Sequence, residues 1–174
     1  MFEEYLTDAR HFCDEASNAR NDQIARRHYR VAVFCTMSAV EAYVNYIADA
    51  QRLGGMLALH EIAFISDKKF GIAGGELAEQ VEYHRLDDKL KFLLTKFVPD
   101  YEVISEPSWC RLMALKNLRD DITHPRQDED EVSIQEYQTK IEQGLSSAID
   151  IMDKLFQGVF DRGLRAKILE LRYE

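Results

Sequence analysis

The stretch from Gln23 to Leu53 contains neither proline nor glycine, and it constrains the fold more than any other part of the chain. Its apolar side chains recur every three or four residues, which is the spacing of one face of an α-helix. The periodic positions are Ile24, Tyr29, Val31, Val33, Phe34, Met37, Val40, Tyr43, Val44, Ile47 and Ala50. A helix of about eight turns is predicted here. Because its middle is nearly apolar all round, it should lie at the centre of a helical bundle.

A second long helix is predicted near the C-terminal end of the sequence. The residues Ser133 to Glu136 form a Ser-x-x-Glu capping box, a pattern that marks the first turn of a helix. Apolar residues then continue at helical spacing as far as Val159. We therefore expect one helix over 133–161, about 28 residues long.

Shorter helices are predicted around these two. Their ranges are 2–16, 56–65, 76–97 with a break near 82–85, 108–124 and 164–173. Asp22 is the expected N-cap of the first long helix, and the glycine-rich stretch 66–75 is expected to form a loop. Strands are not expected, since Val and Ile are scattered through helix-period segments. The predicted fold is an all-α bundle in a single domain, 1–174, with two long central helices.

The net charge of the chain is −9, from 22 basic and 31 acidic residues. Proteins that coat nucleic acid without sequence preference neutralise phosphates with many Lys and Arg side chains, so the composition argues against that class. It leaves room for a small cleft that is basic only locally. The acidic balance otherwise favours solubility.

Three cysteines, Cys13, Cys35 and Cys110, stand far apart and form no pair or cluster with the spacing of a zinc site. Each is expected to be a buried free thiol, and neither a metal nor a cofactor is expected. The N-terminal residues lack the basic and apolar regions of a signal peptide, which favours the cytoplasm. No membrane span is expected, because polar residues interrupt the most apolar stretch, 31–47, before it reaches about 18 apolar residues.

Arg119, Asp120 and His124 form a compact cluster directly before Pro125. Residues five apart differ by about 140° around an ideal helix, so Arg119 and His124 would not share a face of a regular helix. Pro125 should end the helix, and His124 would then lie at the exit, where it can turn toward Arg119. Arg is a permanent cation whose forked donors fit phosphate oxygens, and His can exchange a proton near neutral pH. The cluster is therefore either a site for phosphodiester chemistry or an ordinary surface ion pair at a helix end.

Two polar residues interrupt the apolar middle of the first long helix. Glu41 and Asn45 lie one turn apart on the same face. They form either a satisfied polar pair at a helix contact, or a site in which Glu41 orients a functional Arg or His from a neighbouring helix.

The run from Leu118 to His124 resembles the Arg-polar-x3-His motif of HEPN domains (higher eukaryotes and prokaryotes nucleotide-binding), in which the residue after Arg is typically Asn, Asp or His. The segment from Ser38 to Asn45 resembles the Glu-aromatic-x-Asn segment on the long early helix of many prokaryotic HEPN proteins. With the helix layout, the resemblance covers most of the chain from Gln23 to Phe160. It implies a HEPN-like helical bundle.

Many HEPN proteins are metal-independent endoribonucleases, often toxins or phage-defence components, in which the Arg and His of two protomers face each other across a homodimer cleft. The resemblance implies that Arg119 holds the scissile phosphate, that His124 assists attack by the RNA 2′-hydroxyl and that Asp120 supports the site. The products would be a 2′,3′-cyclic phosphate and a 5′-hydroxyl. The candidate RNA-binding residues are Lys116 and Arg126, and the supporting residues are Glu41, Asn45 and Thr123.

Other HEPN members bind a nucleotide or a protein partner without cleavage, and this is the alternative function. A purely structural helical protein is the third. The expected partners are RNA, a second copy of the chain and a regulatory protein such as an antitoxin. One HEPN toxin group has, two positions after the His, a Tyr that its antitoxin modifies; this position is Arg126 here. The acidic stretch 128–131 beside the motif would repel RNA unless it points away from the site.

Overall fold

A computed structural model describes residues 1–124 and 132–173 of the chain, and this part is mainly helical, as predicted. Its elements, in order, are α1 (Phe2–Ser17), α2 (Asp22–Arg52), α3 (Leu59–Ile65), β1 (Lys68–Ala73), β2 (Glu76–Val81), α4 (Leu86–Phe97), α5 (Pro107–Thr123), α6 (Ile134–Phe160) and α7 (Ala166–Leu169). Arg126, Pro125 and the acidic stretch 128–131 lie outside the described residues.

The two long helices are α2 and α6, and both occur where the sequence predicts them. The hydroxyl of Ser133 accepts a hydrogen bond from the backbone N–H of Glu136 at 3.2 Å, so the predicted cap of α6 is confirmed. The cap of α2 is Asn21 and not Asp22, because the Asn21 side chain accepts the hydrogen bond from Ile24.

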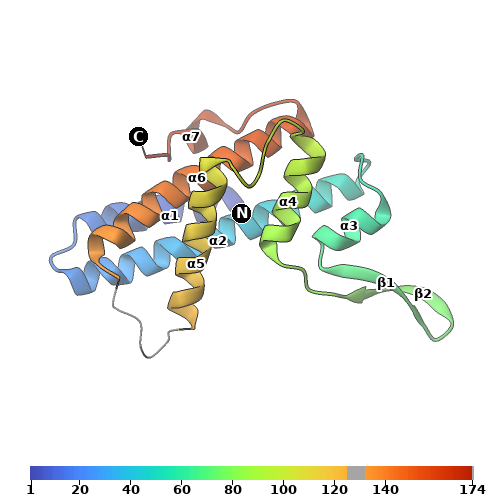
Figure 1. The fold of residues 1–174 in the computed structure, drawn as a ribbon, viewed down its shortest axis with the longest axis horizontal. Helices are drawn as coiled ribbons and strands as arrows, with labels where there is room; N and C mark the ends of the chain where they lie inside the picture. Colours follow the sequence, from blue (N-terminus) through green and yellow to red (C-terminus); the bar gives the residue numbers. More distant parts are fainter. Residues whose placement is uncertain (125–131, 174) are drawn as a thin grey trace.

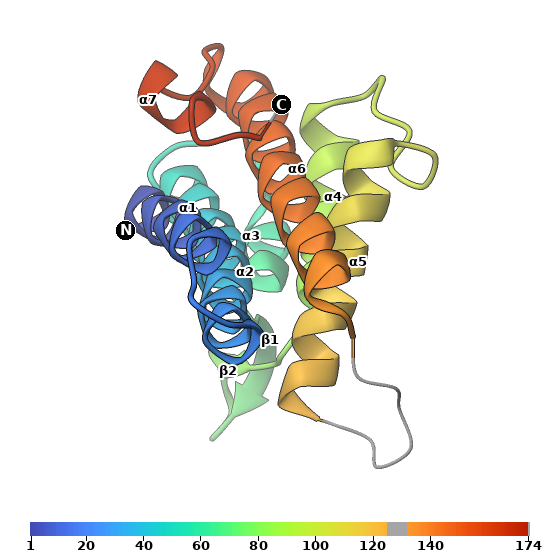
Figure 2. The same cartoon turned by 90° about the vertical axis from the view of Figure 1, so that its left-hand side faces the viewer.

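The helices pack in two groups on either side of α6. Figure 2 shows α1 and α2 on one side of α6, with α4 and α5 on the other. Two glycines of α6 allow close approach to the second group. A Cβ atom at Gly144 would lie 2.7 Å from the Leu115 side chain of α5, and one at Gly158 would lie 2.3 Å from the backbone carbonyl of Phe97 in α4. The apolar side chains of the described helices meet in one core.

Helix α2 lies at the centre of the packing, as predicted, with contacts to α1, α3, α4, α5 and α6. Despite its polar interruptions, it is long and apolar enough to pass as a membrane span by length and composition. More than half of that apolar window, 56%, is buried inside the protein. The packing of the bundle therefore accounts for this apolar character.

A β-hairpin projects from the bundle beside α3 and α4 (Figure 1). Strands β1 and β2 pair antiparallel, with Phe70 opposite Glu79. The prediction of no strands was wrong here. The predicted helix over 76–97 was wrong for 76–81, which form β2, whereas the predicted break near 82–85 is confirmed, since α4 begins at Leu86. Gly74 and Gly75 have φ angles of 62° and 88°. Two successive positive φ angles form the two-residue turn that joins antiparallel strands, and glycine adopts them readily.

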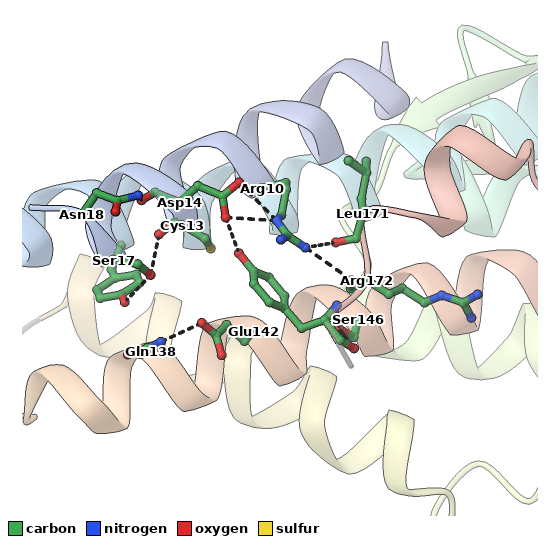
Figure 3. Close-up of polar contacts among 12 residues, drawn as sticks. Arg10, Cys13, Asp14, Ser17, Asn18, Gln138, Glu142, Ser146, Leu171 and Arg172 are labelled. Atoms are coloured by element: carbon green, nitrogen blue, oxygen red, sulfur yellow. Dashed lines mark hydrogen bonds and ion pairs between the residues drawn. The ribbon is translucent and has the colours of Figure 1, made fainter.

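The C-terminal segment is fastened to α1 and α6 by polar contacts. Figure 3 shows the guanidinium of Arg10, which donates hydrogen bonds to the backbone carbonyls of Leu171 and Arg172 at 3.2 and 3.3 Å. The same guanidinium lies 3.9 Å from the centre of the Tyr173 ring. The N–H of Tyr173 donates to the hydroxyl of Ser146 in α6. Of the predicted helix over 164–173, only α7 is helical. Hydrogen bonds with the side chains of Arg10 and Ser146 hold the residues after it.

The cysteines differ in burial, although all three were expected inside. Cys13 is fully buried, and burial raises the pKa of its thiol to about 12. Cys35 is half-buried, and Cys110 is exposed on α5. All three are free thiols.

Candidate functional site

A cleft of about 390 Å³ opens between α2, α4, α5 and the base of the hairpin. Figure 2 shows α4 and α5 on the same side of α2. The cleft is lined by Glu41, Val44, Asn45, Asp67, His84, Arg85, Leu86, Asp87, Lys89, Lys116 and Arg119. Four of these residues, Glu41, Asn45, Lys116 and Arg119, are site residues named from the sequence. Residues far apart in the chain therefore share one hollow.

Arg119 and Lys116 lie one turn apart on α5, and Asp120 contacts both. The Asp120 carboxylate lies 2.9 Å from Nε of Arg119 and 3.2 Å from Nζ of Lys116. The Arg119 side chain is 28% exposed. Its Nε–H is buried, and the Asp120 oxygen lies outside hydrogen-bond geometry, so this donor has no hydrogen-bond partner among the described residues. A buried donor without a partner costs free energy, and an anionic ligand could supply the missing acceptor.

Glu41 and Asn45 reach the cleft from α2, as their shared helix face predicts. Both are exposed. Among the side chains described, neither residue makes a hydrogen bond or an ion pair. Of the two alternatives drawn from the sequence, the satisfied polar pair is therefore wrong. Glu41 shares the cleft with Arg119, but no ion pair joins them, so the Arg119 side chain takes its orientation from Asp120.

The opposite wall of the cleft was missed by the sequence analysis. Lys89 is almost fully buried on α4, and its Nζ lies 2.6 Å from Oδ2 of Asp67. Oδ1 of Asp67 accepts a hydrogen bond of 2.8 Å from the backbone N–H of His84. Burial alone would raise the pKa of Asp67, but the hydrogen bond from His84 and the Lys89 ammonium outweigh it and lower this pKa. Asp67 thus ties both ends of the hairpin to α4.

A second ion pair stands at the start of α4. Nε and a terminal nitrogen of Arg85 donate to the two carboxylate oxygens of Asp87 at 3.2 and 3.0 Å. Asp87 is buried, whereas Arg85 is mostly exposed. No spacing signal pointed to this pair or to Asp67 and Lys89, because 66–75 was expected to be a loop and 76–97 a helix with a break near 82–85. A prediction of the hairpin formed by β1 and β2 would have placed Asp67 close to His84.

His124 lies at the exit of α5, as predicted, and its N–H donates to the carbonyl of Asp120 at 2.8 Å. Its side chain is exposed and does not line the cleft. Thr123 is also exposed, and its hydroxyl donates to the carbonyl of Arg119. The structure thus places Arg119 in the cleft and His124 on the surface at the end of the same helix. Arg126 lies outside the described residues.

No family model matches the chain, and no curated protein or solved structure matches it. Within residues 1–124 and 132–173, no group of three or more His, Cys, Asp or Glu residues is placed to hold a metal ion.

Proposed function

We propose that the protein is a metal-independent endoribonuclease of the HEPN type, which acts as a homodimer in the cytoplasm and serves as a toxin or a phage-defence component. The observation that carries this proposal is the position of Arg119, whose guanidinium lies in a cleft with Lys116. Its buried Nε–H lies beside the Asp120 carboxylate but has no hydrogen-bond partner among the described residues. A phosphate group would supply an acceptor for that donor and a second anion beside the two cations, which share the single carboxylate of Asp120.

The chemistry divides between these residues. Arg119 binds the scissile phosphate and stabilises the charge that develops on its oxygens. Lys116 adds a second positive charge one turn away, and Asp120 holds the two cations side by side. His124 exchanges a proton during the reaction. The reaction joins the 2′ oxygen to phosphorus and releases the 5′ oxygen, which leaves a 2′,3′-cyclic phosphate and a 5′-hydroxyl.

The test is cleavage of a labelled RNA by the purified chain in excess chelator. We expect products with 2′,3′-cyclic phosphate ends, and we expect both Arg119→Ala and His124→Ala to slow their formation by about 10²-fold or more. Cleavage that requires an added divalent cation, products with 3′-hydroxyl ends, or an unchanged rate in either variant would contradict the proposal.

The second candidate is a HEPN-type module that binds a nucleotide or a protein partner without cleaving RNA. The observation in its favour is the exposed His124, which does not line the cleft that holds Arg119. This candidate predicts no cleavage by the wild-type chain and a measurable affinity for a nucleotide or a partner that Arg119→Ala abolishes. Titration calorimetry with a nucleoside monophosphate separates it from the first proposal.

The homodimer is part of the proposal, because one Arg and one His make a sparse site that a two-fold axis would double. An exposed His124 at a helix end is accessible to a second copy. Light scattering at micromolar concentration should give twice the mass of the chain, and a monomer would count against the shared site.

A further inference from the structure

We infer that Glu41 is the residue that takes the proton from the attacking 2′-hydroxyl, while His124 of the second copy in the proposed homodimer supplies the proton to the leaving 5′ oxygen. This assignment rests on the proposed ribonuclease function and adds a catalytic residue to it. It starts from two facts about the cleft. Glu41 lines the cleft together with Arg119, and His124 does not.

Glu41 differs from the other acidic residues of the cleft. Asp67 is paired with Lys89, and Asp87 is paired with Arg85. Among the described residues that line the cleft, Glu41 is the one carboxylate with no ion pair or hydrogen bond. A carboxylate held by a cation is a poor proton acceptor, because protonation breaks the pair. Glu41 can accept a proton without breaking a hydrogen bond or an ion pair to another described residue.

The charged groups that share the cleft with Glu41 come from three directions. Helix α5 contributes Lys116 and Arg119, α4 contributes Asp87 and Lys89, and the segments at the base of the hairpin contribute Asp67, His84 and Arg85. The cations suit a phosphate, and Glu41 enters the same cleft from α2. A nucleotide whose phosphate lies against Arg119 would therefore have an unpaired carboxylate within the same hollow.

The step balances without a cofactor. The 2′-hydroxyl gives its proton to the Glu41 carboxylate, and the 2′ oxygen forms a bond to phosphorus. The bond from phosphorus to the 5′ oxygen breaks, and that oxygen takes a proton from the imidazole ring of His124 of the second copy. Exchange with water then returns Glu41 and His124 to their starting states. Nothing is oxidised or reduced.

The experiment separates the two proton transfers by the leaving group. Wild-type cleavage first maps the cut position in an RNA oligonucleotide. The same oligonucleotide is then made with sulfur in place of the leaving 5′ oxygen, since a thiolate departs without being protonated. His124→Ala should cleave the natural RNA slowly and the sulfur-containing RNA at close to the wild-type rate. Glu41→Gln should cleave both about 10²–10⁴-fold more slowly, the usual contribution of a general base.

Three controls keep the result interpretable. Asp49→Asn changes another exposed acidic residue of α2 that does not line the cleft, and it should keep the wild-type rate. Binding of an uncleavable oligonucleotide with a 2′-deoxy residue at the cut position should be unchanged by Glu41→Gln. In Glu41→Ala, added formate should restore part of the rate, which a purely structural role of Glu41 would not allow.

The outcomes are distinct. Wild-type cleavage with an unchanged rate in Glu41→Gln overturns this inference and leaves the ribonuclease proposal intact. Restoration of Glu41→Gln, and not of His124→Ala, by the sulfur leaving group reverses the two roles and also overturns it. Absence of any cleavage by the wild-type chain overturns both proposals. Circular dichroism confirms that each variant is folded, and formate rescue of Glu41→Ala applies even if Glu41→Gln is unfolded.

Discussion

At the scale of single residues, the cleft is lined by two kinds of contact: neighbours along α5, and a pair that joins α4 to the segment before the hairpin. Lys116, Arg119 and Asp120 stand three and four positions apart, so helical geometry alone brings them together. Nζ of Lys89 lies 2.6 Å from Oδ2 of Asp67, although a hairpin and the start of a helix separate the two residues in the chain. No local pattern encodes such a contact, because it forms only when the bundle positions both segments.

The pair of Asp67 and Lys89 yields a prediction for stability. Asp67→Asn leaves the buried Lys89 ammonium without its counter-charge, and we expect the free energy of unfolding at pH 7 to fall by about 1–3 kcal/mol. Urea denaturation followed by circular dichroism measures it. Asp49→Asn on exposed α2 surface is the matched control and should change the free energy of unfolding by less than about 0.5 kcal/mol.

The ion pair of Asp67 and Lys89 also predicts how the loss of stability in Asp67→Asn depends on pH. The pKa of Asp67 is lowered in the folded protein from its ordinary value of 3.8. The stabilisation is therefore fully present above pH 3.8 and is lost as the pH falls through the lowered pKa of the folded state. The difference between the wild type and Asp67→Asn should shrink in urea titrations at successively lower pH below that value. A difference that grew with acidification would contradict the assignment.

At the scale of elements, the sequence predicted the long helices and missed the hairpin. Helical periodicity sustained over many turns is a strong signal, and caps such as Ser133 sharpen its boundaries. The residues of β2, Glu-Leu-Ala-Glu-Gln-Val, are mostly good helix formers, so local preference favoured the wrong element. Pairing with β1 and the turn at Gly74 and Gly75 make these residues a strand despite that preference. Two adjacent glycines between short apolar runs were the signal that could have revealed it.

The turn gives a prediction confined to this element. Gly75→Val places a β-branched side chain at a φ of 88°, which should cost about 1–2 kcal/mol. Hydrogen exchange followed by NMR should show reduced protection of the amides in β1 and β2, with little change in α2 and α6. Ala73→Val, at the extended end of β1, is the control and should leave protection unchanged. Equal loss of protection throughout the bundle would contradict a local role for this turn.

At the scale of the whole molecule, the sequence predicted an all-α bundle with two long central helices, and this class is confirmed. It did not predict how closely α6 approaches its neighbours. Gly144 and Gly158 lie inside a long helix, where glycine is unfavourable. Glycine is needed at both positions because neighbouring helices leave no space for a Cβ atom. Such close approaches depend on the final helix positions and leave no periodic mark in the sequence.

The approach of α5 to α6 predicts that Gly144→Ala destabilises the fold, although alanine is the better helix former. Its Cβ would lie 2.7 Å from Leu115, and the overpacking should lower the free energy of unfolding by about 1–3 kcal/mol. Gln143→Ala, at the exposed neighbouring position, should change it by less than about 0.5 kcal/mol. Urea denaturation of both variants measures the two changes in the free energy of unfolding. A stabilised Gly144→Ala would contradict the packing described.

The position of α5 against α2 and α4 also sets the site, since it places Arg119 in a cleft. That arginine is the phosphate-binding residue of the proposed site. Arg111 is its matched control, because it is exposed on the same helix and does not line the cleft.

The most direct measurement is the single-turnover rate of RNA cleavage in excess chelator for Arg119→Ala and Arg111→Ala. We predict a loss of about 10²–10³-fold for Arg119→Ala, as expected when one donor to the transition state is removed, and a wild-type rate for Arg111→Ala. Equal rates in the two variants, or a greater loss in Arg111→Ala, would contradict the account.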